Sequence, residues 1–204
     1  MSPDLIKLAT AFLPFAISMS FTPGPNNIMV ANSGAQFGFA RTLPVGAGVV
    51  LGFALLTTVV GLGMVQVVRV APGLFAIMKF ASIVYLLFLA WNIATAEGVK
   101  AGAPPARPIS FLQAAAFQWI NPKGWIMALG AVTTYTSLGS DMIVQVLAIV
   151  VLFIAVGTVS TSTWTLFGQL IKRFLTTRRK RIAFNLTMAA LLVASVAPVI
   201  FEHF

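Results

Sequence analysis

Two short polar stretches interrupt apolar segments that are otherwise long enough to cross a membrane. The first is Thr-Pro-Gly-Pro-Asn-Asn at 22–27, and the second is Asn-Pro-Lys-Gly at 121–124. Proline removes a backbone donor from a helix, and an unsatisfied backbone group is costly in lipid. The two stretches therefore predict broken helices whose polar groups face protein or a polar cavity, and they constrain the fold more than any other feature.

The composition is that of an integral membrane protein. Of the 204 residues, 59% are hydrophobic and 8% are charged, whereas soluble domains are about 45–50% apolar and about 25% charged. The net charge of +9 comes mainly from basic residues between the apolar segments, which indicates topology signals rather than nucleic-acid binding. There is no cysteine, and the acids and the one histidine lie at segment ends or in loops. We therefore expect no metal site and no cofactor.

Taking about 20 apolar residues as one crossing, we predict six membrane-spanning helices. Their ranges are 5–34, 43–65, 73–94, 111–134, 142–169 and 182–202, and the polar stretches interrupt the first and the fourth. In the first segment, an apolar run follows Lys7 as in a secretory signal. The run continues past the break, however, and has no Ala-x-Ala cleavage site. We interpret it as a retained span rather than a cleaved signal.

A linker rich in glycine and proline divides the predicted spans into two sets of three. This gives a first three-helix repeat at 1–96, a cytoplasmic linker at 97–110 and a second three-helix repeat at 111–204. Each set begins with a broken helix, and because three is an odd number, the second set must enter the membrane upside down. The predicted fold is all-α, with two inverted repeats as in many secondary transporters.

The distribution of lysine and arginine predicts the orientation. With the N-terminus outside, the outer face keeps Lys7 and Arg69, and Lys79 and Lys123 lie within predicted spans. The cytoplasmic side then carries Arg41, Lys100, Arg107 and all six basic residues between 172 and 181. We therefore expect both termini to lie outside.

The breaks are predicted to create the N-termini of two half-helices. Pro122 fits as the first residue of a half-helix capped by Asn121. Pro23 or Pro25 fits as the start of another that runs through Asn27. Exposed N–H groups give each of these ends a partial positive charge. In inverted repeats the two ends approach one region from opposite sides, where an anionic group would be stabilised.

Two lysines lie inside predicted spans. Lys123 is near the middle of its span, where a lysine costs about 2.5–3.5 kcal/mol. We expect it to face a polar cavity; the alternatives are that it reaches an interface or bonds carbonyls freed by the break. Lys79 lies about two turns into its span, so an interfacial and a functional role are equally open. Because burial disfavours the charged form of a lysine, both residues are candidates for proton coupling.

Small and hydroxyl-bearing residues mark two further helix faces. Gly48 and Gly52, spaced four apart, predict close packing between helices of the chain, with a homodimer contact as the alternative. In the fifth span, one helical face gathers the hydroxyl groups of Thr158, Thr161, Ser162 and Thr165. These groups predict a polar path, and the alternative is that they bond back to carbonyls of their own helix.

Four parts of the sequence together resemble the LysE/RhtB family of bacterial amino-acid exporters. They are the stretch at 22–27, the glycines from Gly34 to Gly52, Lys79 with Tyr85-Leu86, and Asn121-Pro122-Lys123. The resemblance covers essentially the whole chain and, at 22–28, 90–95, 108–111 and 181–193, is greatest to the cysteine and O-acetylserine exporter branch. It implies an inner-membrane efflux protein that moves amino acids outward, driven by the proton gradient. The signature residues are Pro23, Gly24, Pro25, Asn26, Asn27, Asn121, Pro122 and Lys123.

Our leading hypothesis is a secondary transporter that exports small neutral amino acids or derivatives, such as cysteine, O-acetylserine, serine, threonine or homoserine, by alternating access. Lys123 and the half-helix N–H groups would bind the carboxylate. The ammonium would be received by freed carbonyls and by Asn26, Asn27 and Asn121, with Thr158 and Thr161 as further contacts. The acids lie at span ends or in loops, so none is available in mid-membrane to bind a cationic side chain.

Other functions stay open. Export of other amino acids, such as lysine, arginine or leucine, and a passive channel for small solutes would both use the same spans. An enzyme is disfavoured, because the spans offer serines, but no histidine or acid lies within the membrane interior to activate them. The expected partners are the amino-acid substrate, the proton gradient and membrane lipids.

Overall fold

The computed structural model describes residues 3–64, 80, 83–84, 87–88, 90–91, 94–95, 107–136, 142–171 and 173–201. All regular structure in these ranges is helical, which confirms the all-α prediction for the described part of the chain. Lys79, most of the predicted third span at 73–94 and most of the linker at 97–110 lie outside the described residues.

The first predicted span is a broken helix. α1 (Pro3–Phe21) ends before the proline-rich stretch, and α2 (Pro25–Phe37) begins after it with a bend of 53°. Pro25 lies in the first turn of α2, where its missing N–H loses no helical hydrogen bond. Gly38, at φ 82°, ends α2 and donates its N–H to Gly34 O at 2.9 Å.

Two unbroken helices correspond to the second and fifth predicted spans. α3 (Phe39–Val59) continues into a π-helical turn, η1 (Val60–Met64), and α8 is Met142–Ile171. In the described ranges, these two are long and apolar enough to cross a membrane, and the bent α1–α2 pair is a third candidate. The count of six spans therefore stays a prediction.

The fourth predicted span is also broken. α6 (Phe111–Phe117) begins with a capping box formed by Ser110 and Gln113. A 3₁₀ turn, η2 (Gln118–Ile120), follows, and α7 (Pro122–Tyr135) begins at the expected proline. α9 (Arg178–Phe201) covers most of the sixth predicted span.

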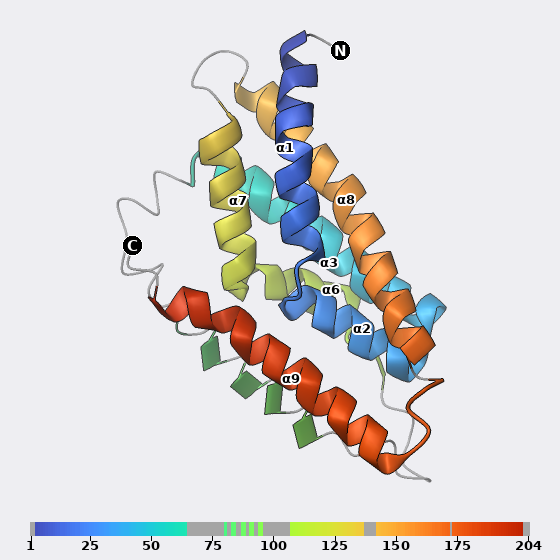
Figure 1. Cartoon of the computed structure of the whole chain (residues 1–204). Helices are drawn as coiled ribbons and strands as arrows, with labels where there is room; N and C mark the ends of the chain where they lie inside the picture. The colour runs from blue at the N-terminus through green and yellow to red at the C-terminus, as the bar shows by residue number, and fades with distance from the viewer. Residues whose placement is uncertain are drawn as a thin grey trace.

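α8 contacts α1, α2, α3 and α7, and α3 contacts α2, α6, α7 and α8, so these two long helices make most of the contacts between elements. α1 runs down toward its break and the neighbouring α7 runs up from the other break, so the two broken segments are antiparallel (Figure 1). An inverted repeat requires this opposite direction, although the repeat as a whole stays a prediction.

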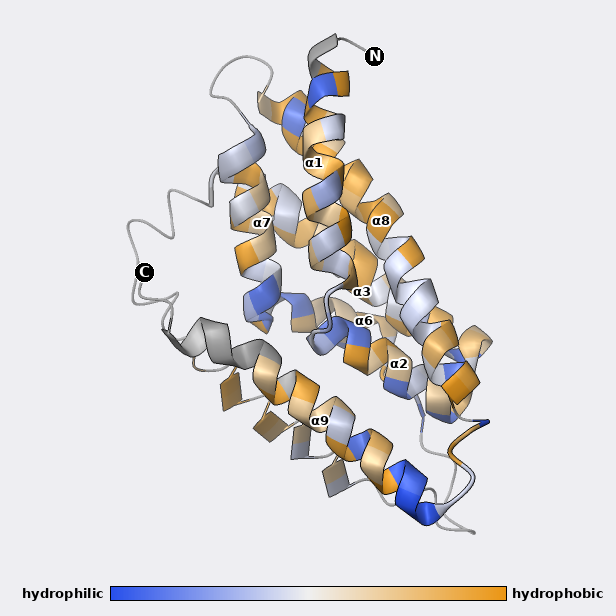
Figure 2. Cartoon of the chain, viewed as in Figure 1, coloured by the Kyte–Doolittle hydropathy of each residue, from blue (hydrophilic) through white to orange (hydrophobic). Residues whose placement is uncertain are grey.

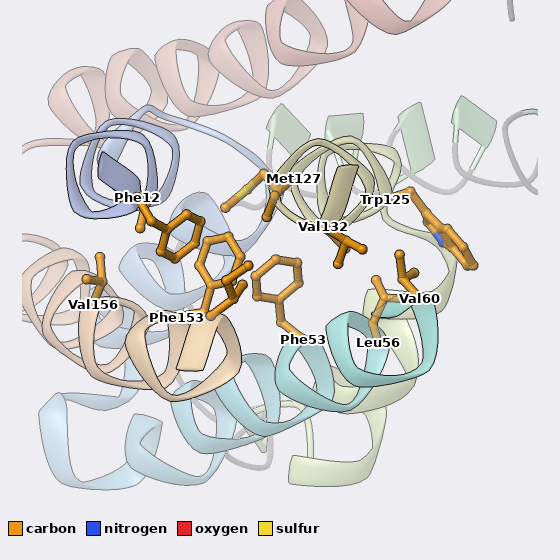
Figure 3. Packing of buried hydrophobic residues seen from close by; sticks show 13 residues of the cluster. Phe12, Phe53, Leu56, Val60, Trp125, Met127, Val132, Phe153 and Val156 are labelled. Atoms are coloured by element: carbon orange, nitrogen blue, oxygen red, sulfur yellow. The ribbon is translucent and has the colours of Figure 1, made fainter. Parts of the chain in front are cut away.

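Buried apolar side chains form two large clusters and a small third one at Ala54, Val146 and Val150. The cluster between α1, α3, α7 and α8 contains a row of aromatic rings, in which Phe153 packs edge-on against Phe12 and Phe53 (Figure 3). The centroid distances are 4.8 Å and 4.9 Å, within the favourable range for aromatic pairs. The other large cluster joins α2, α3, α6 and α9 through residues such as Ile28, Val49 and Phe117.

Glycines allow two close helix crossings. A Cβ on Gly168 of α8 would overlap the backbone of Ala31 in α2. On α3, a Cβ on Gly48 would overlap Phe111 O of α6, and a Cβ on Gly52 would lie 2.6 Å from the Cα of Ala115. The predicted packing role of Gly48 and Gly52 within the chain is therefore confirmed.

We expect Gly168→Ala to lower the thermal unfolding midpoint of the purified protein in detergent. Alanine is favoured over glycine inside a helix by roughly 1 kcal/mol, but overpacking against Ala31 should cost roughly 1–3 kcal/mol. Gly130→Ala is the matched control, because its Cβ would lie 3.8 Å from the nearest atom, Phe15 Cζ. Equal midpoints for the two variants would contradict the close crossing of α2 and α8.

Candidate functional site

The two breaks meet in space. Lys123, at the start of α7, reaches across to the first break, where its Nζ donates a hydrogen bond to Thr22 O at 2.7 Å. A Cβ on Gly24 would lie 3.0 Å from Lys123 Cδ. The backbone at Gly24 is extended, with φ −170°, so space for the lysine rather than backbone conformation explains the glycine. The alternative that Lys123 bonds a freed carbonyl is confirmed.

A reciprocal pair of amides joins the breaks a second time. Asn26 Nδ2 donates to Gln118 Oε1 at 2.9 Å, and Gln118 Nε2 donates to Asn26 Oδ1 at 3.0 Å. Gln118 is fully buried and also donates to Ala114 O at 3.0 Å. The start of α2 is thereby fixed against η2.

Side chains also satisfy the carbonyls that the first break frees. Asn27 Nδ2 donates to both Ser20 O and Thr22 O at 2.9 Å. Ser160 of α8 donates its hydroxyl to Ser20 O at 2.8 Å. Because these carbonyls already accept hydrogen bonds, they are poorly placed to receive a substrate ammonium.

Asn121 occupies the cap position of α7 but does not cap it. Its side chain makes no cap hydrogen bond, so the predicted capping role is wrong. The residue is only 1% exposed, and its Oδ1 is buried without a hydrogen-bond partner. A buried acceptor without a partner costs about 1–3 kcal/mol. A ligand that donated a hydrogen bond to this oxygen would remove that cost.

A small cavity, which we call the central cavity, lies where the breaks meet. Its volume is about 50 Å³, enough for a few water molecules. Residues of both breaks line it, and hydrophilic residues gather here between apolar helices (Figure 2). Phe53 and Phe153 form its wall on the side of the aromatic row. The predicted site residues on its lining are Gly24, Pro25, Asn26, Asn27, Asn121, Lys123 and Thr161.

The predicted hydroxyl face of α8 lies mainly elsewhere. Thr161 lines the central cavity, but all four residues of the face line a second cavity between α3 and α8. The hydroxyls of Thr158, Thr161 and Thr165 donate to carbonyls one turn earlier, at 2.7–2.8 Å. The alternative of bonding within the helix is therefore confirmed for these threonines.

The sequence does not single out Gln118 or Ser160 as members of the site. A glutamine beside a break in an apolar segment was an available signal for Gln118. The partners, however, are Asn26 and the carbonyl of Ser20, which are 92 and 140 residues away. Local spacing carries no information about such distant pairings.

A double-mutant cycle on thermal or denaturant unfolding tests the amide pair. We expect Asn26→Ala and Gln118→Ala to be coupled by roughly 0.6–2 kcal/mol, since each removes the other's buried partner. The control cycle uses Asn32→Ala and Gln36→Ala, whose amides bond at 3.0 Å on the exposed surface of α2 and should couple by at most about 0.5 kcal/mol. Strict additivity at 26 and 118 would show that the pair does not hold the breaks together.

Comparisons with known proteins identify the family. Residues 17–200 match the LysE type translocator family. The chain is 30% identical over 193 residues to the cysteine/O-acetylserine efflux proteins of Escherichia coli K12 and Shigella sonnei Ss046, covering 95% of this chain and 96% of theirs. For the protein of that description in Shigella flexneri, the identity is 30% over 186 residues, covering 91% and 94%. No solved structure matches significantly. The chain therefore belongs to the LysE family of amino-acid efflux transporters.

Proposed function

We propose that this chain exports small neutral amino acids across the bacterial inner membrane and holds them where the two breaks meet. The observation that carries the proposal is that one cavity is lined both by Lys123, which brings an ammonium, and by Asn121, whose side-chain oxygen is buried without a hydrogen-bond partner. A free amino acid brings a carboxylate and an ammonium, which complement these two groups.

The carboxylate would bind at Lys123. An ammonium carries three donors, and one of them is used on Thr22 O, so donors remain for a substrate. The first residue of α2, Pro25, and the N-cap residue of α7, Asn121, both line the central cavity, and the N-terminus of a helix favours an anion. Both effects act on the same end of the substrate.

The ammonium would bind at Asn121 Oδ1, with Asn26, Asn27 and Thr161 as further contacts. Asn26 and Asn27 also hold the junction through their own hydrogen bonds. Among the described residues that line the central cavity, none is acidic, so a lysine or arginine side chain would find no ionic partner there. The small volume of about 50 Å³ likewise favours short side chains. The relatives named cysteine/O-acetylserine efflux proteins support substrates of that size.

The proposed architecture has six spans in two inverted repeats, and the site opens alternately to the two faces of the membrane as the repeats move against each other. Its support is the antiparallel course of the two broken segments. Export would draw on the proton gradient, and Lys79 and Lys123 remain the proposed coupling residues. A passive channel would use the same cavity but would move substrate only down its gradient.

Efflux from cells or vesicles loaded with labelled O-acetylserine or serine tests the site. We expect Asn121→Ala and Lys123→Met to reduce uphill export at least about tenfold, the loss of one charge-assisted contact worth about 1.4 kcal/mol or more. Asn121→Ala is the sharper test, because Asn121 Oδ1 makes no hydrogen bond whose loss could unfold the protein. An uncoupler should abolish uphill export by the parent.

Lys180→Ala serves as the matched control, since it removes an exposed lysine near the start of α9. It should export like the parent. If the Asn121 and Lys123 variants are inserted, stable and fully active, the central cavity is not the binding site. If the parent moves substrate only down the substrate's own concentration gradient, and the uncoupler does not change this movement, the passive channel is favoured.

Reporter fusions at each end of the chain test the orientation. We expect an alkaline-phosphatase-type reporter to be active at both termini, because the basic residues from Arg41 and from the start of α9 would lie in the cytoplasm. Removing Arg178, Arg179, Lys180 and Arg181 together should weaken this preference. A cytoplasmic signal from either terminus would contradict the proposed topology.

A further inference from the structure

We propose that the second cavity, between α3 and α8, is a transit position where the substrate rests before it reaches the central cavity. This inference rests on the proposed function. The α3–α8 cavity has a volume of about 270 Å³, against about 50 Å³ for the central cavity. In the described conformation it is therefore the larger of the two chambers, and a small amino acid fits it more readily.

The chemistry of its wall suits a primary ammonium. Thr158, Thr161 and Thr165 all line this cavity, and their hydroxyl hydrogens are used on carbonyls of α8. A hydroxyl that donates to its own helix keeps oxygen lone pairs as acceptors. These three hydroxyls thus offer acceptors rather than donors to a molecule in the cavity. Thr42 on the α3 side is not counted among these acceptors, because its Oγ1 donates to Gly38 O and also bonds Ser33 Oγ, each at 2.9 Å.

The two cavities share a wall. Val50 of α3 and Thr161 of α8 line both of them. A glycine stands beside each: a Cβ on Gly157 would lie 3.5 Å from Val50 Cγ2, and a Cβ on Gly46 would lie 3.6 Å from Thr161 Oγ1. Val50 and Thr161 are therefore the side chains common to both linings, and their small neighbours leave them room to change rotamer.

The position of the α3–α8 cavity places it on the basic side of the central cavity. It involves the first half of α3, which begins beside Arg41, and the second half of α8, which precedes Arg173. On the opposite side, the central cavity meets the row of Phe53, Phe153 and Phe12 (Figure 3). An exporter loads from the cytoplasm, so the order of chambers runs from the α3–α8 cavity to the central cavity.

Binding in this chamber should be weaker than at the breaks. Its described lining offers acceptors for an ammonium but includes no lysine or arginine for a carboxylate. The carboxylate would stay hydrated until it reaches Lys123. The substrate therefore gains binding energy when it moves from the α3–α8 cavity to the central cavity. The competing occupant is a lipid chain, because Leu43 and Leu51 at the edge of the cavity are 52% and 49% exposed.

Labelling of a single cysteine distinguishes these occupants, and the parent chain contains no cysteine to interfere. Gly46→Cys places a thiol in the α3–α8 cavity, where a Cβ meets only ordinary contacts. We expect a charged maleimide to label it from the cytoplasmic face of membrane vesicles. Serine or O-acetylserine at about ten times its apparent Kd for the α3–α8 cavity should slow labelling about tenfold, because the cavity is then almost always occupied.

Ala47→Cys lines the same cavity and provides a second reporter if the first variant does not insert. Leu170→Cys, an exposed position on α8 that lines neither cavity, is the unprotected control. Labelling by an apolar maleimide alone would overturn the inference, because the chamber would then hold lipid. Labelling without protection by substrate would also overturn it, while export that depends on Lys123 would leave the proposed function standing. If the parent chain itself shows no uphill export of these amino acids, the proposed function is refuted.

Discussion

A helix that breaks inside a membrane leaves backbone carbonyls that lipid cannot satisfy, and the whole structure depends on how this chain satisfies them. The carbonyls of Ser20 and Thr22 accept hydrogen bonds from Asn27, Ser160 and Lys123. Only Asn27 belongs to the first broken segment. The bend between α1 and α2 is therefore completed by α7 and α8, and the two breaks form one unit.

This arrangement gives Lys123 a structural role beside the substrate-binding role proposed for it. Its bond to Thr22 O compensates part of the cost of a lysine among apolar helices. A substrate carboxylate that draws the ammonium away would leave Thr22 O with Asn27 as its side-chain partner. Substrate binding would thereby loosen the contact between α7 and the first break, which links occupancy of the cavity to the helices that must move in alternating access.

The parts of the structure that local chemistry determines could be predicted from the sequence. Pro25 and Pro122 start half-helices because proline fits the first turn of a helix and disrupts its interior. The hydroxyl face of α8 follows from helical periodicity and was found on one cavity wall. The prediction that the Asn121 side chain caps α7 was wrong. An asparagine before the first proline of a helix has the same sequence pattern whether its amide caps the helix or lies buried without a partner.

The remaining contacts of the site depend on tertiary packing and could not be predicted from the sequence. The bond between Asn26 and Gln118 and the reach of Ser160 to Ser20 O depend on how α8 and η2 pack against the first break, which no local pattern encodes. For the same reason, the sequence predicted a single site at the breaks but not a second chamber between α3 and α8.

In the proposed pathway, the distribution of donors and acceptors gives the two chambers different parts. Helix-bonded threonines offer only oxygen lone pairs in the larger chamber, whereas the central cavity adds a cation at Lys123 and an unpartnered acceptor at Asn121. A zwitterion therefore finds partners for one end first and for both ends later. Because Val50 and Thr161 lie between the chambers, a solute must displace them to gain the second set of contacts. A molecule without an ammonium or without a carboxylate would gain less at one of the two steps, so the order of the chambers itself selects for free amino acids.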